Sequence, residues 1–282
     1  QDDKKVSEIF NTFFNEVVGT LDIDKLENIV APVETQDSVL ACVQKYRNHP
    51  SIAKIKELNL VDDRNNTFNF TPIDIEIIYT EICNLSTSKS SPKDSIPAKL
   101  IQENCEIFAH KIFIDFHRAI QDGSFPNNLK SADISPVFKK GDRSEKTNYR
   151  PVSILSPLSK IFERLLFTQI NKYMDSKLSL YQCGFRRNMG TQNCLLFLIE
   201  RWKKCLDKKG VAGVLLTDLS KAFDPLHHEL LIAKLEAYGF DYVSLKLIFS
   251  YLNKRYQRVR INSSYSCWLE IIFGVPQGSI LG

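Results

Sequence analysis

An aspartate that follows a short apolar run is the residue of this chain best suited to catalysis. Asp218 comes directly after residues 214–217, and Phe223 and Asp224 lie within the next six positions. A carboxylate at the end of a strand can bind a hard cation such as Mg²⁺ beside a phosphate group. Aspartates in such places more often cap helices or form turns, so Asp218 alone does not establish a metal site.

The neighbours of Asp218 and a second segment each allow two interpretations. Asp224 directly precedes Pro225, so capping of a helix N-terminus explains it, and we do not predict that it binds metal. Phe223 suits a hydrophobic core as well as a ligand pocket. Residues 274–282 contain three glycines, a proline and Gln277. They predict either a turn that opens a strand or helix, or a loop that approaches a nucleotide closely.

Basic residues gather in the C-terminal half. Residues 130–282 carry a net charge of +11, whereas residues 1–129 carry −7. Lys and Arg clusters bind polyanions by releasing counterions, which makes the C-terminal half the candidate nucleic-acid surface; a solvated basic face is the alternative. Aromatic residues that could stack on bases accompany these cations. The candidates for phosphate contact are Lys139, Lys140, Arg143, Lys146, Arg150, Arg186, Arg187, Lys254, Arg255, Arg258 and Arg260.

The composition excludes several other classes of protein. The 282 residues are 43% hydrophobic and 25% charged, which is typical of a globular chain with a substantial core. The seven cysteines form no Cys-x-x-Cys pair, and no histidine pair has zinc spacing, so we predict neither a disulfide framework nor a structural zinc site. No signal peptide and no apolar run near the roughly 20 residues that span a bilayer is present. These observations predict an intracellular protein without a membrane segment.

Hydrophobic periodicity predicts the elements that must position these residues. Strands are expected over 132–138, 214–217 and 256–261, and strict alternation in the last places Arg258 and Arg260 on one face. Helices before, between and after these strands predict an α+β fold. The expected helices cover residues 6–17, a segment with Thr71 as N-cap, a long segment through Ile101 and Cys105 that ends at Gly123, residues 156–173, residues 191–206 and a segment that starts at Asp224 and ends at Gly239.

Several blocks, in this order, resemble the reverse transcriptases of non-LTR retrotransposons. Residues 135–142 (Ser-Pro-Val-Phe-Lys-Lys-Gly-Asp), 148–155 (Asn-Tyr-Arg-Pro-Val-Ser-Ile-Leu) and 160–164 (Lys-Ile-Phe-Glu-Arg) are similar to the family's fingers region. Residues 181–186 with 190–191 resemble its next block. Residues 214–224 (Val-Leu-Leu-Thr-Asp-Leu-Ser-Lys-Ala-Phe-Asp) resemble the first palm motif, and 274–282 (Gly-Val-Pro-Gln-Gly-Ser-Ile-Leu-Gly) the Gly-x-Pro-Gln-Gly block.

The resemblance also implies an organisation of the chain. Residues 130–282 would form the fingers and a partial palm of a right-hand-like polymerase, without a thumb. Residues 1–129 would form a mainly helical segment between the family's endonuclease and its polymerase, because 89–97 and 123–126 are similar to that segment.

The two palm blocks imply roles for five residues. Asp218 matches the catalytic, metal-binding aspartate, and Leu219 matches the residue whose main-chain carbonyl joins it at the metal. Ala222 and Phe223 match the floor of the pocket for the incoming nucleotide. The ring of Phe223 matches the steric gate, which would collide with a ribose 2′-hydroxyl. Gln277 matches the glutamine near the nascent base pair.

The basic segments imply contacts with phosphate groups. Lys139, or Lys140 in its place, and Arg150 match the fingers residues that grip the triphosphate. Nucleic-acid contacts are expected from four further arginines, which are Arg186, Arg187, Arg258 and Arg260.

The implied activity is that of an RNA-directed DNA polymerase, a nucleotidyltransferase of a transposable element. Two Mg²⁺ ions, or Mn²⁺ in their place, would promote attack of a primer 3′-hydroxyl on a deoxynucleoside triphosphate. The implied partners are an RNA template and a DNA primer or target. The implied place of action is the nucleus, and the sequence does not predict an oligomeric state.

One family block is missing from these 282 residues. The Ala-Asp-Asp box, which carries the family's other metal ligands, would follow Gly282. We therefore expect residues 1–282 alone to be inactive. The alternative is a non-catalytic nucleic-acid-binding remnant of a decayed element, whose salt-sensitive RNA binding would survive the substitution Asp218→Asn.

Overall fold

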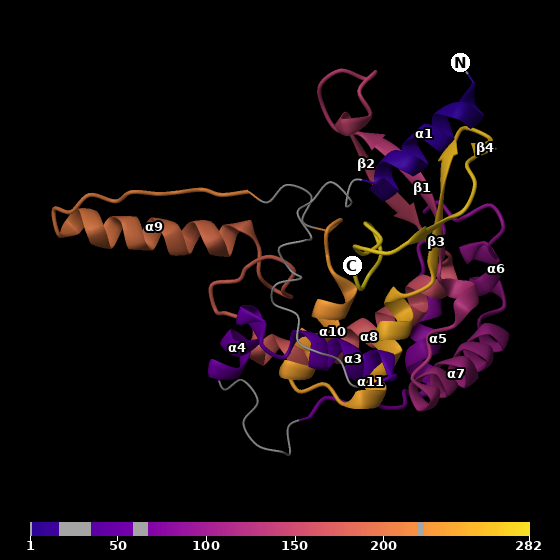
Figure 1. The fold of residues 1–282 in the computed structure, drawn as a ribbon, viewed down its shortest axis with the longest axis horizontal. Helices are drawn as coiled ribbons and strands as arrows, with labels where there is room; N and C mark the ends of the chain where they lie inside the picture. Colours follow the sequence, from indigo (N-terminus) through magenta and orange to yellow (C-terminus); the bar gives the residue numbers. More distant parts are fainter. Residues whose placement is uncertain (1, 17–34, 59–66, 219–222) are drawn as a thin grey trace. The chain divides into compact units, whose positions relative to one another are not determined.

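The computed structural model describes residues 2–16, 35–58, 67–218 and 223–282 (Figure 1). The chain divides into two compact units. The first unit comprises the described residues up to 167 and from 223 onward, and the second comprises residues 168–218. The first unit holds the sheet and most of the helices.

A five-stranded mixed sheet organises the first unit. β1 (Ser131–Phe138) pairs antiparallel with β2 (Tyr149–Ile154) and parallel with β3 (Arg255–Ile261). The strand β3 also pairs antiparallel with β4 (Ser264–Tyr265) and with β5 (Leu269–Ile271). The parallel pair places residues more than 100 positions apart in the sequence side by side.

The helix α1 (Asp3–Glu16) lies against one face of this sheet (Figure 1). Because side chains alternate along a strand, Ile134 of β1 and Val259 of β3 share that face. Both are buried, and the rings of Phe10 and Phe14 pack against them. The apolar stripe of α1 and the apolar face of the sheet thus form one core.

The remaining helices of the first unit form two further packing groups. α10 packs on α3, α4 and α11, and α7 packs on α5 and α11. The rings of Phe125 and Tyr251 lie 5.0 Å apart, as do those of Phe116 and Phe162. The helices are α3 (Ser38–Tyr46), α4 (Pro50–Glu57), α5 (Ile75–Cys83), α6 (Ala98–Glu103), α7 (Cys105–Asp122), α8 (Pro157–Met174), α10 (His228–Ala237) and α11 (Tyr242–Leu252). The last turns of α8, from residue 168 onward, belong to the second unit.

Several predicted elements are confirmed, and the fold is mixed α/β with a sheet. The helices α1, α8 and α9 (Thr191–Asp207), the strands β1 and β3, and the opposite faces of Arg258 and Val259 agree with the sequence patterns. Gly123 ends α7 in the left-handed conformation, with φ +60°. None of the helices in the described segments is both long and apolar enough to cross a membrane.

Two helix predictions need correction. The predicted long helix through Ile101 and Cys105 is broken into α6 and α7, because Asn104 adopts φ −121° and its side chain donates to the carbonyl of Leu100. The helix α5 starts at Ile75 rather than at Pro72, and Asp74, with an extended backbone and no capping hydrogen bond from its side chain, occupies the N-cap position that we expected Thr71 to take. Aspartate and threonine both favour this position, so the sequence did not distinguish them.

The prediction of a buried strand over 214–217 is wrong. These residues have no regular secondary structure and are exposed; the exposed fractions of Leu215 and Leu216 are 89% and 85%. A strand needs a neighbour that satisfies its backbone N–H and C=O groups. No strand among the described residues pairs with this segment.

Candidate functional site

Two segments that are about 50 residues apart in the sequence lie against each other in the first unit. The backbone N–H of Gly274 donates to the carbonyl of Leu226 at 2.8 Å, and that of Val275 donates to the carbonyl of Phe223 at 3.3 Å. The structure therefore joins the turn that carries Phe223 to the loop that carries Gln277. These two residues were predicted independently from different sequence blocks.

Gly274 permits this close approach. Its φ of +74° lies in the left-handed region, which favours glycine. A Cβ atom at this position would lie 2.7 Å from the carbonyl oxygen of Asp224 and 2.8 Å from that of Phe223. Both contacts are with backbone, so any larger residue would push the two segments apart.

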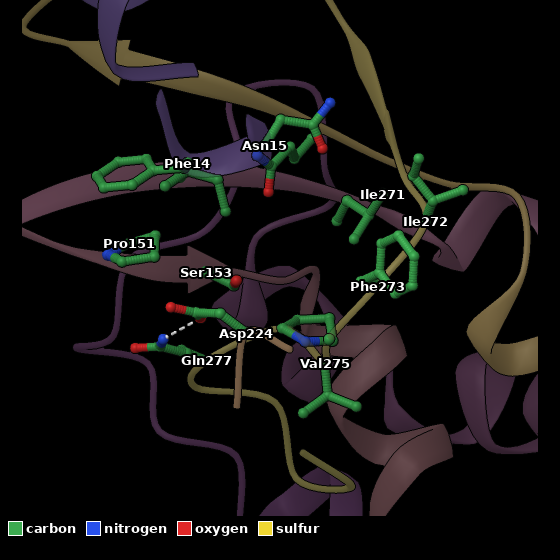
Figure 2. Close-up of a pocket in the computed structure, with 14 residues that line it drawn as sticks. Phe14, Asn15, Pro151, Ser153, Asp224, Ile271, Ile272, Phe273, Val275 and Gln277 are labelled. Atoms are coloured by element: carbon green, nitrogen blue, oxygen red, sulfur yellow. Dashed lines mark hydrogen bonds between the residues drawn. The ribbon is translucent and has the colours of Figure 1, made fainter. Parts of the chain in front are cut away.

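The side chain of Asp224 forms a second connection between the two segments. Nε2 of Gln277 donates to Oδ1 of Asp224 at 2.7 Å (Figure 2). The prediction that Asp224 caps a helix is therefore wrong. Residues 223–225 form a turn, and α10 starts only at His228, with His227 as its N-cap. The Asp224 carboxylate instead accepts a hydrogen bond from Gln277, which is distant in the sequence, so no local pattern could indicate this contact.

The Gln277 loop also contacts the strand β2. The backbone N–H of Ser153 donates to the carbonyl of Gln277 at 2.8 Å, and Gly278 follows with φ +105°. Arg150 lies three residues before Ser153 on β2, so its side chain lies on the opposite face of the sheet, where it is exposed. One strand thus carries the predicted triphosphate contact and supports the Gln277 loop.

A small cavity of about 50 Å³ adjoins these segments (Figure 2). Its lining includes Asp224 and Gln277, Pro151 of β2 and Phe273, and α1 contributes Phe14. The volume is enough for one or two water molecules, not for a nucleotide. The cavity is therefore the inner edge of the candidate site and not a complete substrate pocket.

Two buried polar side chains hold the backbone of the Gln277 loop. Nε2 of His228 donates to the carbonyl of Gly274 at 2.6 Å, and burial lowers the pKa of this histidine. The carboxylate of Glu163 accepts the backbone N–H of Ile280 at 2.7 Å, and burial raises the pKa of Glu163. Sequence reasoning missed both residues. The available signals for Glu163 were its place in the block 160–164 and its position among apolar residues on one face of α8.

The loop between β1 and β2 presents the basic residues of the predicted fingers. The backbone N–H of Lys139 donates to the carbonyl of Asn148 at 2.9 Å and closes this loop. The side chains of Lys139 and Lys140 are exposed. The guanidinium of Arg143 lies 4.9 Å from the centre of the Phe138 ring, so this cation packs on the hairpin itself.

Arg258 and Arg260 lie on the same face of β3 but have different surroundings. The guanidinium of Arg258 donates to Asp133 at 2.7 Å and to Asp94 at 2.8 Å, and its side chain is 14% exposed. The Trp268 ring lies 4.5 Å from it. Arg260 is exposed and donates to a backbone carbonyl at 3.0 Å. Arg260 is the more accessible of the two predicted nucleic-acid contacts.

The second unit contains the other predicted residues that can be described. Asp218 and Arg187 are exposed. Arg186 donates to the carboxylate of Asp175 at 3.1 Å. Leu219 and Ala222 lie outside the described residues. In the described part of the chain no three His, Cys, Asp or Glu side chains cluster as metal ligands, so Asp218 supplies a single carboxylate.

Comparison with known proteins identifies the family of the chain. Residues 137–282 match the family described as "Reverse transcriptase (RNA-dependent DNA polymerase)". The "Probable RNA-directed DNA polymerase from transposon BS" of Drosophila melanogaster is 31% identical over 214 residues, which are 75% of this chain and 24% of that protein. The corresponding protein of the X-element of the same species is 33% identical over 174 residues, 61% of this chain and 19% of the relative.

A third relative comes from another species. The "RNA-directed DNA polymerase from mobile element jockey" of Drosophila funebris is 28% identical over 214 residues, again 75% of this chain and 23% of the relative. The matched part of the chain spans about a quarter of the length of these curated relatives.

The chain belongs to the reverse transcriptase family. The match begins at residue 137, near the end of β1, and covers β2, the Phe223 turn and the Gln277 loop. Within this family the chain is of the jockey-like, non-LTR retrotransposon type, as its sequence blocks predicted.

Proposed function

We propose that this chain is part of an RNA-directed DNA polymerase that copies the RNA of a non-LTR retrotransposon. The proposed reaction joins a deoxynucleotide to a primer 3′-hydroxyl on an RNA template. The observation that carries the proposal is the hydrogen-bonded union of the Phe223 turn with the Gln277 loop, beside the strand that bears Arg150. This union gives residues from separate sequence blocks a common location, as a nucleotide-binding site requires.

In this proposal the chain's own residues bind and select the nucleotide. The ring of Phe223, which is 37% exposed, would exclude a ribose 2′-hydroxyl by steric contact, and we propose that Ala222 belongs to the floor of the same pocket. Gln277 would contact the nascent base pair. Lys139 and Arg150, both exposed, would neutralise the triphosphate, because the reaction depends mainly on positioning and on positive charge around the phosphates.

Asp218 and the main-chain carbonyl of Leu219 would hold magnesium, or manganese in its place. A carboxylate and a carbonyl are suitable oxygen donors, and they supply two of the roughly six that Mg²⁺ takes. A bound divalent ion supplies charge neutralisation at the reacting phosphate. We propose two such ions in the complete polymerase, with further carboxylates from outside residues 1–282.

We also propose roles for the two halves of the chain and for four arginines. Residues 130–282 would form the fingers and part of the palm, and residues 1–129 would form the segment between endonuclease and polymerase. Arg186, Arg187, Arg258 and Arg260 would contact the RNA template or the DNA primer. The protein would act within the cell, in the nucleus.

Primer extension tests the proposed function. The complete reading frame that encodes these residues is expressed, and its product is given an RNA template, a DNA primer, Mg²⁺ and deoxynucleotides. We expect extension by the wild type and extension at background level after Asp218→Asn. We expect Phe223→Ala to increase the incorporation of ribonucleotides, because the steric gate is removed.

Residues 1–282 alone serve as a further sample, and we expect no extension from them because they hold one predicted metal carboxylate. Unchanged extension by the Asp218→Asn protein would contradict the proposed catalytic site. Equal sugar selectivity in the wild type and in Phe223→Ala would contradict the gate.

A further inference from the structure

The hydrogen bond between Asp224 and Gln277 determines which way the Gln277 amide faces. An ionised carboxylate can only accept hydrogen bonds, so the amide must turn its NH₂ group toward Asp224. Its carbonyl oxygen then points away from Asp224, as the sticks in Figure 2 show. The amide therefore offers its surroundings an acceptor in a defined direction.

The backbones of both residues are already held in place. The turn that contains Asp224 is held by the bonds from Gly274 and Val275. The backbone of Gln277 is held by Ser153, and the residues that follow it are held by buried Glu163. The freedom that remains belongs to the side-chain torsions of Gln277, and the 2.7 Å bond to a carboxylate is of the kind that removes it.

We propose that Asp224 is a positioning residue that holds the Gln277 amide with its carbonyl oxygen presented to a hydrogen-bond donor of the incoming nucleotide or nascent base pair. This inference rests on the proposed function, because it assigns a substrate to the Gln277 amide. It adds a role for Asp224, which follows Phe223 directly in the chain. The residue that orients the base-pair contact thus lies in the same turn as the proposed sugar gate.

Loss of Asp224 leaves the Gln277 amide without its acceptor. The side chain then samples several torsions and both amide orientations, and only some of these states present the carbonyl oxygen. The affinity for the correct nucleotide falls in proportion to the fraction of productive states. A loss of roughly tenfold in kcat/KM, mainly through a higher KM, is expected from the removal of a hydrogen bond to a charged group.

A double-mutant cycle in the primer-extending product of the complete reading frame tests the positioning role. The values of kcat/KM for the correct deoxynucleotide are compared for the wild type, Asp224→Ala, Gln277→Ala and the double variant. If Asp224 acts through Gln277, the double variant is no slower than Gln277→Ala alone. Asp224→Asn offers an NH₂ donor as well as an acceptor oxygen, so it permits both orientations of the Gln277 amide and is expected to restore the rate only in part. Multiplicative losses in the double variant would show a separate, structural role and overturn the proposal.

A second measurement follows the contact itself and needs no activity. In the 282-residue chain, Gln277→Glu places two carboxylates against each other and lowers the melting temperature. Adding Asp224→Asn restores a donor and an acceptor, and the melting temperature recovers. Failure of the second substitution to recover the loss would overturn the contact.

The two measurements separate the inference from the function on which it rests. If the wild type does not extend primers, the proposed function fails, and the positioning role fails with it. If the wild type extends primers but the cycle is multiplicative or the melting temperature does not recover, only the inference fails. If Asp224→Ala unfolds the protein, Asp224→Ser replaces it in the cycle.

Discussion

At the scale of single residues, Arg258 illustrates how carboxylates within the fold can neutralise a cation. Its guanidinium pairs with Asp133, which is 1% exposed, and packs against the Trp268 ring. A carboxylate buried this deeply is stabilised only while its partner is present. Only 14% of the Arg258 side chain is therefore left exposed for the proposed contact with nucleic acid, whereas Arg260, two residues later, lies at the surface.

We expect Arg258→Ala to lower the free energy of unfolding by about 3 kcal/mol, because it leaves the buried Asp133 carboxylate without its ion-pair partner and with only the backbone N–H of Lys93, at 3.4 Å, as a donor. The matched control Arg260→Ala, on the same face of the same strand, is expected to change stability by less than about 0.5 kcal/mol. Urea titration of both variants measures the difference. Equal losses of stability would show that the pair with Asp133 contributes little.

Sequence patterns predicted the candidate residues better than they predicted the partners of these residues. Phe223 and Gln277 could be identified because family blocks preserve their spacing. The partners of Asp224 and Glu163 could not be predicted, because each contact joins residues that are more than 50 positions apart. Local rules indicated a helix cap for Asp224, and the tertiary contact overrode them.

At the scale of elements, α10 and the Gln277 loop are joined by a histidine. His228, in the first turn of α10, is buried, and its Nε2–H donates to the carbonyl of Gly274. Burial is the main cause of its lowered pKa, and the positive charge of nearby Arg255 acts in the same direction. The hydrogen bond to the Gly274 carbonyl acts in the opposite direction but does not outweigh burial, so protonation of this buried histidine is disfavoured in the folded chain.

This arrangement predicts a pH dependence of stability. The pKa of His228 is lower in the folded chain than its ordinary value of 6.5, so the unfolded chain binds more protons below that pH. The contribution of neutral His228 to the free energy of unfolding is complete above about pH 6.5 and is lost as the pH falls through the lowered pKa. His228→Gln keeps a donor for Gly274 but does not titrate.

We therefore expect the melting temperature of the wild type to fall relative to that of His228→Gln between pH 7 and pH 5. Thermal unfolding of both proteins at pH 7, 6 and 5 measures this difference. A difference that does not change with pH would exclude His228 as the source.

Individual helices and strands could be predicted from the sequence, but the pairing of the strands could not. Helices with a clear apolar stripe, such as α1 and α8, were predicted within three residues of their bounds. The strands β1 and β3 were predicted from alternation and apolar content, but their parallel pairing was not. The apolar run at 214–217 has strand-like composition, yet pairing depends on a neighbouring strand, which a local pattern cannot specify.

At the scale of the whole molecule, the uneven charge distribution predicts the behaviour toward nucleic acid. Residues 130–282 carry the net charge of +11, and Lys139 and Lys140 are exposed on the β1–β2 hairpin. Binding that depends on such cations weakens as salt rises, because the release of condensed counterions into a more concentrated salt solution is less favourable.

We expect the 282-residue chain to bind single-stranded RNA with an affinity that falls steeply with salt. Replacing Lys139 and Lys140 by alanine should lower the slope of log K against log salt by about 1.4, or about 0.7 for each lost phosphate contact. The control, in which Lys54 and Lys56 of α4 are replaced by alanine, removes the same charge from the N-terminal half. Equal changes of slope in both double variants would show that Lys139 and Lys140 do not contact the RNA.

The parallel pairing of β1 with β3 has a consequence for synthesis of the chain. About 120 residues separate the two strands, so at roughly 5–20 residues per second the ribosome needs about 6–25 s to deliver β3 after β1. During this interval the β1–β2 hairpin has an unpaired edge on the β1 side, and α1 lacks the strand on which most of its sheet contacts are made. The nascent chain thus passes through an aggregation-prone stage, in which chaperone binding at the β1 edge would protect it.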